Sequence, residues 1–160
     1  MNSVQNIAPH SRVWIYQSDK EFNASQLNTI TELKSVFLEQ WESHEVPIKG
    51  AIEVLHNRFI LILIDETSDK VCGGSVDSSV RFMKELEKEL GVSLLNRMLV
   101  AYKKDGKIFS CTLPEFESLA KKGEVNKDTI VFNNSVHTFS QFENEWEVPA
   151  EKSWHKNFIL

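Results

Sequence analysis

The sequence lacks most of the features that assign a chain to a class at once. It has only two cysteines, Cys72 and Cys111, with no CxxC pair, which favours free thiols in a cytoplasmic protein. Its longest apolar run, Phe59–Ile64, is far too short to cross a bilayer, and residues 1–11 lack the pattern of a signal peptide. The net charge of −5 comes without the basic stripe of a nucleic-acid binder. We therefore expect a cytoplasmic protein that binds neither nucleic acid nor a membrane.

The composition is that of an ordinary globular domain. The chain has 160 residues, of which 41% are hydrophobic and 26% charged. A chain of this length buries roughly 70% of its unfolded surface, so it needs neither a disulfide nor a metal to complete a core. We expect one domain, or one domain with a small appended module.

Residues 1–102 have the element order of a ferredoxin-like βαββαβ sandwich, within the α+β class. The expected elements are a strand at 13–16, a helix from 23 or 25 to 43, a hairpin at 50–55 and 59–65 that turns at residues 56–58, a helix at 78–90 and a strand at 98–102. Phe59–Ile64 is apolar at every position, as is typical of a central strand covered on both faces. In a ferredoxin-like sheet this strand lies beside the first strand and parallel to it, with both helices on one face.

Residues 103–160 predict a small ββαβ extension. The turn at Asp105–Lys107 is followed by a strand, by a helix that begins with the capping box Thr112-x-x-Glu115, and by another strand. This pattern resembles a bacterial GYF-like module, in the residues Asp105, Gly106, Lys107, Leu113, Phe116, Leu119, Gly123, 128–132, Trp146 and Pro149. An insertion at 133–145 precedes the tryptophan, and the aromatic peptide-binding motif of eukaryotic GYF domains is not visible. The resemblance implies a small adaptor fold packed against the first portion.

Segments along the whole chain resemble a small family of uncharacterised bacterial proteins. They are RVWIYQ at 12–17, FLEQW at 37–41, HNRF at 56–59, SVDSSVRF at 75–82 and VPAEKSWH at 148–155. Some members of that family carry the description "ABC transporter ATPase". A P-loop, however, needs G-x-x-x-x-G-K-[ST], whose backbone N–H groups and lysine hold the phosphates. The chain has no such motif, since Gly106–Lys107 is followed by Ile108, so we predict that it is not a transporter ATPase.

The turn at Cys72–Ser79 is the best sequence candidate for a ligand site. Its two glycines allow close backbone approach, and N–H groups at the start of the following helix favour an anion. Parallel first and third strands would bring the ends of both strands to this turn. The predicted ligand-binding residues are Gln17, Asp65, Cys72, Gly73, Gly74, Ser75, Asp77 and Ser78. Capping of the next helix by Ser75, Asp77 or Ser78 is the simpler interpretation of the turn, and its carboxylates oppose a phosphate.

Two catalytic alternatives use the same region. In the first, Cys72 is a nucleophile whose base is His56, His137 or His155. In the second, a small hydrolase holds a metal on three carboxylates, those of Asp65, Glu66 and Asp77. No zinc spacing links the histidines, and no G-x-S-x-G motif is present.

The patterns favour a non-catalytic binding or adaptor module over a hydrolase. We predict no catalytic residue, no cofactor and no metal, and a protein or small-molecule ligand as the partner of a monomer or a homodimer. Trp154, near the C-terminus, is expected to clamp the two portions together rather than to line a dimer interface.

Overall fold

A computed structural model describes residues 7–66 and 73–159 of the chain. The elements are β1 (Arg12–Gln17), α1 (Ala24–Gln40), β2 (Glu42–Ser43), β3 (Val46–Pro47), β4 (Gly50–Leu55), β5 (Phe59–Ile64), α2 (Gly73–Leu90), β6 (Leu99–Lys104), β7 (Lys107–Thr112), α3 (Leu113–Lys121), β8 (Ile130–Phe132), α4 (Phe139–Glu145) and β9 (Glu147–Pro149), with 3₁₀ turns at η1 (Ala150–Lys152) and η2 (Trp154–Phe158). Helices and sheets together confirm the predicted α+β class. Within the described ranges, no helix combines the length and the apolar character needed to span a bilayer.

The first sheet has the order β1-β5-β4, and both of its strand pairs are antiparallel. The predicted parallel pairing of the first and third long strands is wrong, because Arg12 lies opposite Ile64 and Gln17 lies opposite Phe59. The expected fourth strand, β6, pairs with β7 and β8 in a separate sheet. Residues 1–102 therefore do not form the predicted ferredoxin-like sandwich. An apolar strand identifies a central position, but either direction of its neighbour buries the same side chains.

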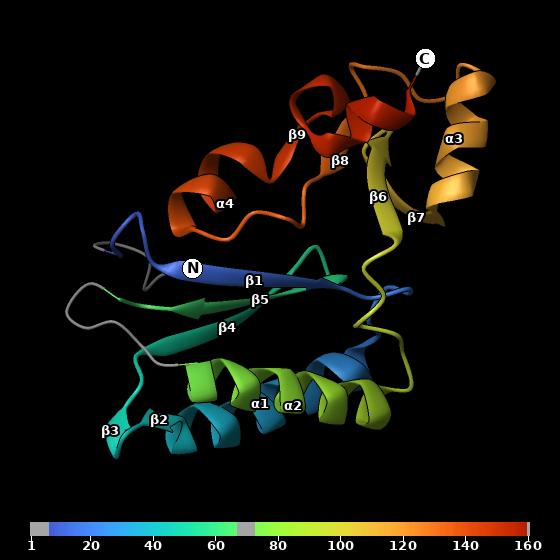
Figure 1. Cartoon of the computed structure of the whole chain (residues 1–160). Coiled ribbons are helices and arrows are strands. Elements are labelled where there is room, and N and C mark those ends of the chain that lie inside the picture. The colour runs from blue at the N-terminus through green and yellow to red at the C-terminus, as the bar shows by residue number, and fades with distance from the viewer. Residues whose placement is uncertain (1–6, 67–72, 160) are drawn as a thin grey trace.

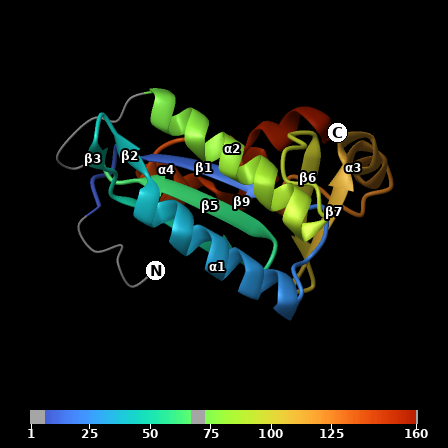
Figure 2. The same ribbon diagram turned by 90° about the horizontal axis from the view of Figure 1, so that it is seen from below.

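The central strand β5 supplies side chains to two cores. Ile60, Ile62 and Ile64 face α1 and α2, which lie side by side across one face of the sheet (Figures 1 and 2). The alternate side chains, Phe59, Leu61 and Leu63, pack with Phe132, Phe139 and Trp146 on the other face, where Figure 1 shows α4. All six β5 residues are buried. The strand therefore joins the helical layer to the C-terminal part of the chain.

Helix α2 begins at Gly73, earlier than the predicted start at residue 78. Contacts with distant residues hold this first turn. The Trp41 indole Nε1 donates to the Ser75 carbonyl at 2.9 Å, and the Ser75 hydroxyl donates to the Glu42 carbonyl at 3.3 Å. Tertiary hydrogen bonds thus override the low helix propensity of Gly73 and Gly74. Ser75, Asp77 and Ser78 consequently lie inside the helix rather than ahead of it, so the predicted capping turn is wrong.

The second sheet has the order β7-β6-β8-β9. The helix α3 covers one of its faces through Phe116, which packs with Val100, Tyr102 and Val131. The opposite face sends Ala101 and Phe132 into the core shared with β5. The ββαβ extension was predicted over residues 103–160, but the observed order of two strands, a helix and a strand begins at Leu99 with β6, β7, α3 and β8. The expected boundary between residues 102 and 103 therefore falls inside β6.

Candidate functional site

The predicted ligand site does not assemble around the start of α2. Gln17 ends β1 opposite Phe59, whereas Asp65 follows Ile64 at the other end of the same strand pair. Six residue steps along a strand, from Phe59 to Asp65, separate the two positions by roughly 20 Å. Ser75 is buried, Asp77 is exposed, and Gly73 and Gly74 open the helix, while Cys72 lies outside the described residues. The antiparallel register is the physical reason that these residues do not meet.

Gln17 instead joins three segments through its buried amide. Its Nε2 donates to the Ser110 hydroxyl at 3.0 Å, and its Oε1 accepts from Asn134 Nδ2 at 2.9 Å. Asn134 in turn accepts from the Trp146 indole Nε1 at 3.0 Å. Gln17 is only 4% exposed, so its amide depends on these two hydrogen bonds rather than on water. The bonds therefore fix β1 against the segments that contain Ser110 and Asn134.

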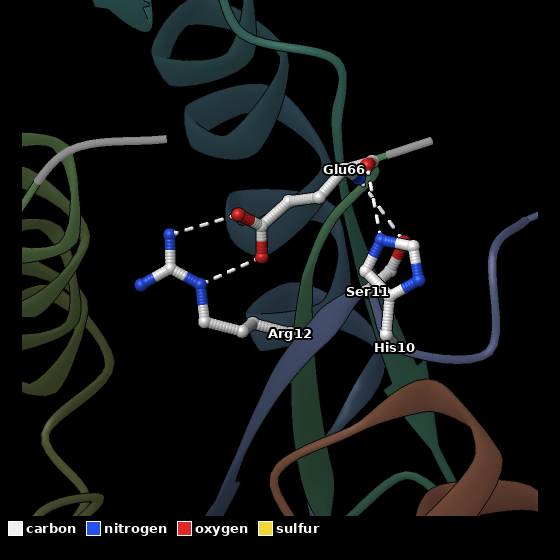
Figure 3. A network of polar contacts seen from close by, with 4 residues as sticks. All are labelled: His10, Ser11, Arg12 and Glu66. Carbon is white, nitrogen blue, oxygen red and sulfur yellow. Dashed lines mark hydrogen bonds and ion pairs between the residues drawn. The ribbon is translucent and has the colours of Figure 1, made fainter. Parts of the chain in front are cut away.

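Glu66 is held by three consecutive residues at the start of β1 (Figure 3). The Arg12 guanidinium donates to both carboxylate oxygens, with Nε–Oε1 at 2.7 Å and Nη2–Oε2 at 3.2 Å. The Glu66 N–H donates to the Ser11 hydroxyl at 3.0 Å, and His10 Nε2 lies 3.2 Å from the Glu66 carbonyl. The arrangement is a two-pronged ion pair that ties β1 to the end of β5.

The proposed carboxylate metal site is also not formed. Asp65, Glu66 and Asp77 all belong to the described residues, and no three His, Cys, Asp or Glu side chains among those residues gather as metal ligands. Glu66 is committed to Arg12, and Asp77 is an exposed residue of α2.

The three candidate histidines lie in three different environments. His56 stacks on Trp146 with ring centroids 5.8 Å apart and contacts Glu147 Oε1 at 3.4 Å. His137 is exposed. His155 is fully buried, with Nδ1 2.7 Å from the Ser153 hydroxyl, its ring stacked on Trp154 and its Nε2 without a hydrogen-bond partner in the described part of the chain. The three histidines therefore do not share one environment, and Cys72 lies outside the described residues, so the nucleophile interpretation stays a prediction.

The buried His155 predicts an acid-sensitive fold. Burial lowers the pKa of its imidazole from 6.5 to about 4. Between these values the unfolded chain binds more protons than the folded one, so the free energy of unfolding falls as the pH drops through the window. The expected loss attributable to this group is about 3 kcal/mol between pH 6.5 and 4.

Urea unfolding at a series of pH values measures this loss. His155→Phe keeps a ring against Trp154 and Phe116 but cannot be protonated, so its stability curve should be flatter than that of the natural chain between pH 6.5 and 4. Parallel curves for the two proteins over that window would contradict the assignment to His155.

A hollow lies beside the outer edge of β1. It has a volume of about 360 Å³, within the range of ligand sites. Its walls come from β1, from residues 94–97 ahead of β6 with Leu99 at the start of β6, and from the loop 134–137, with Trp154 from η2. We call it the β1 groove; its lining residues are Val13, Trp14, Ile15, Gln17, Leu94, Asn96, Arg97, Leu99, Asn134, Ser135, Val136, His137 and Trp154.

Chain segments bracket the edge of β1 at both ends of the groove. The Val13 N–H donates to the His137 carbonyl at 3.0 Å, and the Phe139 N–H donates to the Ser11 carbonyl at 2.8 Å. At the other end, the Asp19 N–H donates to the Ser93 carbonyl at 3.2 Å. Because backbone groups of alternate residues point to the same side of a strand, Ile15 also presents its N–H and C=O away from β5.

Arg97 crosses the groove at the Ile15 carbonyl. Its Nη1 donates to that oxygen at 2.8 Å, and its Cζ lies 4.9 Å from the centre of the Tyr16 ring. Of the described residues that line the groove, Arg97 alone carries a permanent charge. The guanidinium is thus fixed at two points while its remaining N–H groups are available for an anion.

Sequence reasoning missed nearly all of this site. Gln17 was predicted to bind a ligand and lines the groove, but among different neighbours. Trp154, predicted to clamp the two portions, stacks on His155 and lines the same groove as β1. Arg97 gave no signal, because an arginine between a helix and a strand matches no motif. Comparison with protein-family models, with curated proteins and with solved structures gives no match.

Proposed function

We propose that the protein is a non-catalytic binding module and that the β1 groove is its binding site for an extended peptide. The observation that carries the proposal is a buried stretch of strand edge that no other strand in the described ranges pairs, between two stretches that are hydrogen-bonded to neighbouring segments, beside a hollow. Strand edges bind extended peptides through their backbone groups, and neighbouring pockets select side chains. Binding sites also occur preferentially where two parts of a fold meet.

The lining of the groove supports a peptide over a purely apolar ligand. Leu99 and Trp154 offer partly exposed apolar surface, the buried Leu94 and Val136 line the same hollow, and Asn96 and Ser135 add exposed polar groups. Such a mixture of apolar walls and a few polar groups is typical of sites that orient a ligand as well as bury it.

We also propose a GYF-like adaptor fold for the C-terminal portion. The succession β6, β7, α3, β8 supports it, because GYF-like modules have the order strand, turn, strand, short helix, strand. The peptide site proposed here lies at the junction of this portion with the first sheet and does not use an aromatic motif of the eukaryotic kind.

Labelled protein on an array of random dodecapeptides tests the proposal. One copy of the array links each peptide through its N-terminus and a second copy through its C-terminus. We expect the natural chain to bind a defined subset of peptides, and Ser135→Trp, which places an indole at the rim of the groove, to weaken that binding about tenfold or more. Ser35→Trp, on the exposed face of α1, is the matched control and should bind as the natural chain does.

Two results would overturn the peptide site. One is the absence of binding on both arrays. The other is binding that Ser135→Trp and Ser35→Trp leave equally intact, which would move the site away from the groove.

A further inference from the structure

The geometry points to a peptide C-terminus as the group that the β1 groove binds, with its carboxylate on Arg97 and the Ile15 N–H. This inference rests on the proposed peptide site and names the part of the peptide that enters it. Three features carry it: two unpaired backbone groups of β1, the position of Arg97 across the strand edge, and the charge of the groove.

Two of the backbone groups on this edge that lack a partner strand in the described ranges, the Val13 carbonyl and the Ile15 N–H, are the ones that matter for the direction of a bound peptide. Both face away from β5, since Val13 N–H already bonds His137 on that side and Ile15 C=O bonds Arg97. Neither group bonds another residue in the described ranges. Val13 and Ile15 are each 1% exposed, and buried backbone groups without partners are rare because they lose hydrogen bonds to water.

The Val13 carbonyl and the Ile15 N–H can both hydrogen-bond to a single peptide residue only if the peptide runs in one direction. A residue whose N–H reaches the Val13 carbonyl, and whose carbonyl receives the Ile15 N–H, runs parallel to β1. Its carboxyl end then points toward Gln17, which is the side on which Arg97 lies against the Ile15 carbonyl. The preceding residues must leave the edge, because His137 and Phe139 already pair with Val13 and Ser11.

Arg97 determines that the bound residue is the last one. The arginine side chain occupies the edge at Ile15, so an extended chain cannot continue along β1 past this point. A chain that ends there places a carboxylate beside a guanidinium, which is the pairing that the planar fork of arginine favours. The opposite terminus would place an ammonium group beside Arg97 and is disfavoured by charge.

The Tyr16 ring prepares Arg97 for this role. It lies under the guanidinium at 4.9 Å, and the Ile15 carbonyl fixes Nη1, so little side-chain freedom is lost when a carboxylate binds. The buried Leu94 and Val136 beside the groove favour an apolar side chain on the terminal residue.

The test compares free-acid and C-terminally amidated forms of the peptides selected on the arrays. We expect binders almost entirely on the array with free C-termini, and about ten- to hundred-fold weaker binding of the amides by fluorescence anisotropy. Arg97→Gln should weaken the free acid by a similar factor and leave the amide unchanged. In NMR spectra, the free acid should shift the Ile15 amide signal.

The outcomes separate this inference from the peptide site itself. Equal binding of acid and amide forms, blocked by Ser135→Trp, would overturn the carboxylate assignment and retain the groove as a peptide site. If Arg97→Gln and Arg97→Lys weaken the binding of the free acid and of the amide by the same factor, Arg97 only supports the fold. Absence of binding on both arrays would overturn both proposals.

Discussion

Replacing Leu61 by alanine is expected to lower the free energy of unfolding by about 3 kcal/mol. The side chain is fully buried in the core between the first sheet and α4, so its loss removes apolar burial and leaves a cavity. The same loss should reach the C-terminal sheet, because Phe132 and Trp146 pack in the same core as Leu61. We therefore expect the chain to unfold as one unit.

Amide hydrogen exchange, together with urea unfolding, measures this coupling. In Leu61→Ala the slowly exchanging amides of β4 and of β6 should lose protection to the same extent. Ile62→Ala, which empties the core on the helix side, is the matched control and should give the same uniform loss. If Ile62→Ala lowers protection in β4 while β6 keeps its full value, the two sheets unfold independently and the expectation is wrong.

Arg12→Met is expected to lower the free energy of unfolding by about 2–3 kcal/mol. The substitution keeps the aliphatic stem and removes the guanidinium from the Glu66 carboxylate, whose side chain is only 6% exposed. Removing one partner of a buried pair is costly because the other charge stays in a poorly solvated position. The exposed part of Arg12, 31% of its side chain, keeps the effect below that of a fully buried pair.

Two comparisons isolate the buried charge as the cause. Lys103→Met breaks the ion pair between Lys103 and Glu147, in which the two side chains are 32% and 36% exposed. This substitution should lower the free energy of unfolding by less than about 1 kcal/mol. The double variant Arg12→Met with Glu66→Leu should recover most of the loss caused by Arg12→Met alone. If the double variant loses as much free energy of unfolding as Arg12→Met and Glu66→Leu lose together, the lost contacts and not the unpaired charge cause the destabilisation.

Local features were predictable wherever neighbouring residues decide the backbone. The hairpin turn at His56 and Asn57 has the positive φ angles expected there, 52° and 53°. Thr112 caps α3, as its capping box indicated, and Asn23 caps α1. Each of these depends on residues within a few positions of one another, so the sequence contains the whole interaction.

The candidate site was not predictable, because its parts are distant in the chain. Ile15, Arg97 and Ser135 meet only when β1, the segment before β6 and the loop before α4 pack together. The turn at Cys72–Ser79 gave a strong local signal, but its residues from Gly73 onward became helix through Trp41 and Glu42. Glycines and hydroxyl groups suited both a loop and a helix start, and distant hydrogen bonds made the choice.

By itself, the sequence determined the α+β class, the order of most elements and the double burial of Phe59–Ile64, since these follow from short-range periodicity and local backbone preferences. Only the tertiary structure decided that β1 runs antiparallel to β5, that β6 belongs to a second sheet, and that a groove opens beside β1. The physical reason is that an all-apolar strand is equally well buried by a neighbour in either direction. Contacts between residues far apart in the chain choose between the two directions.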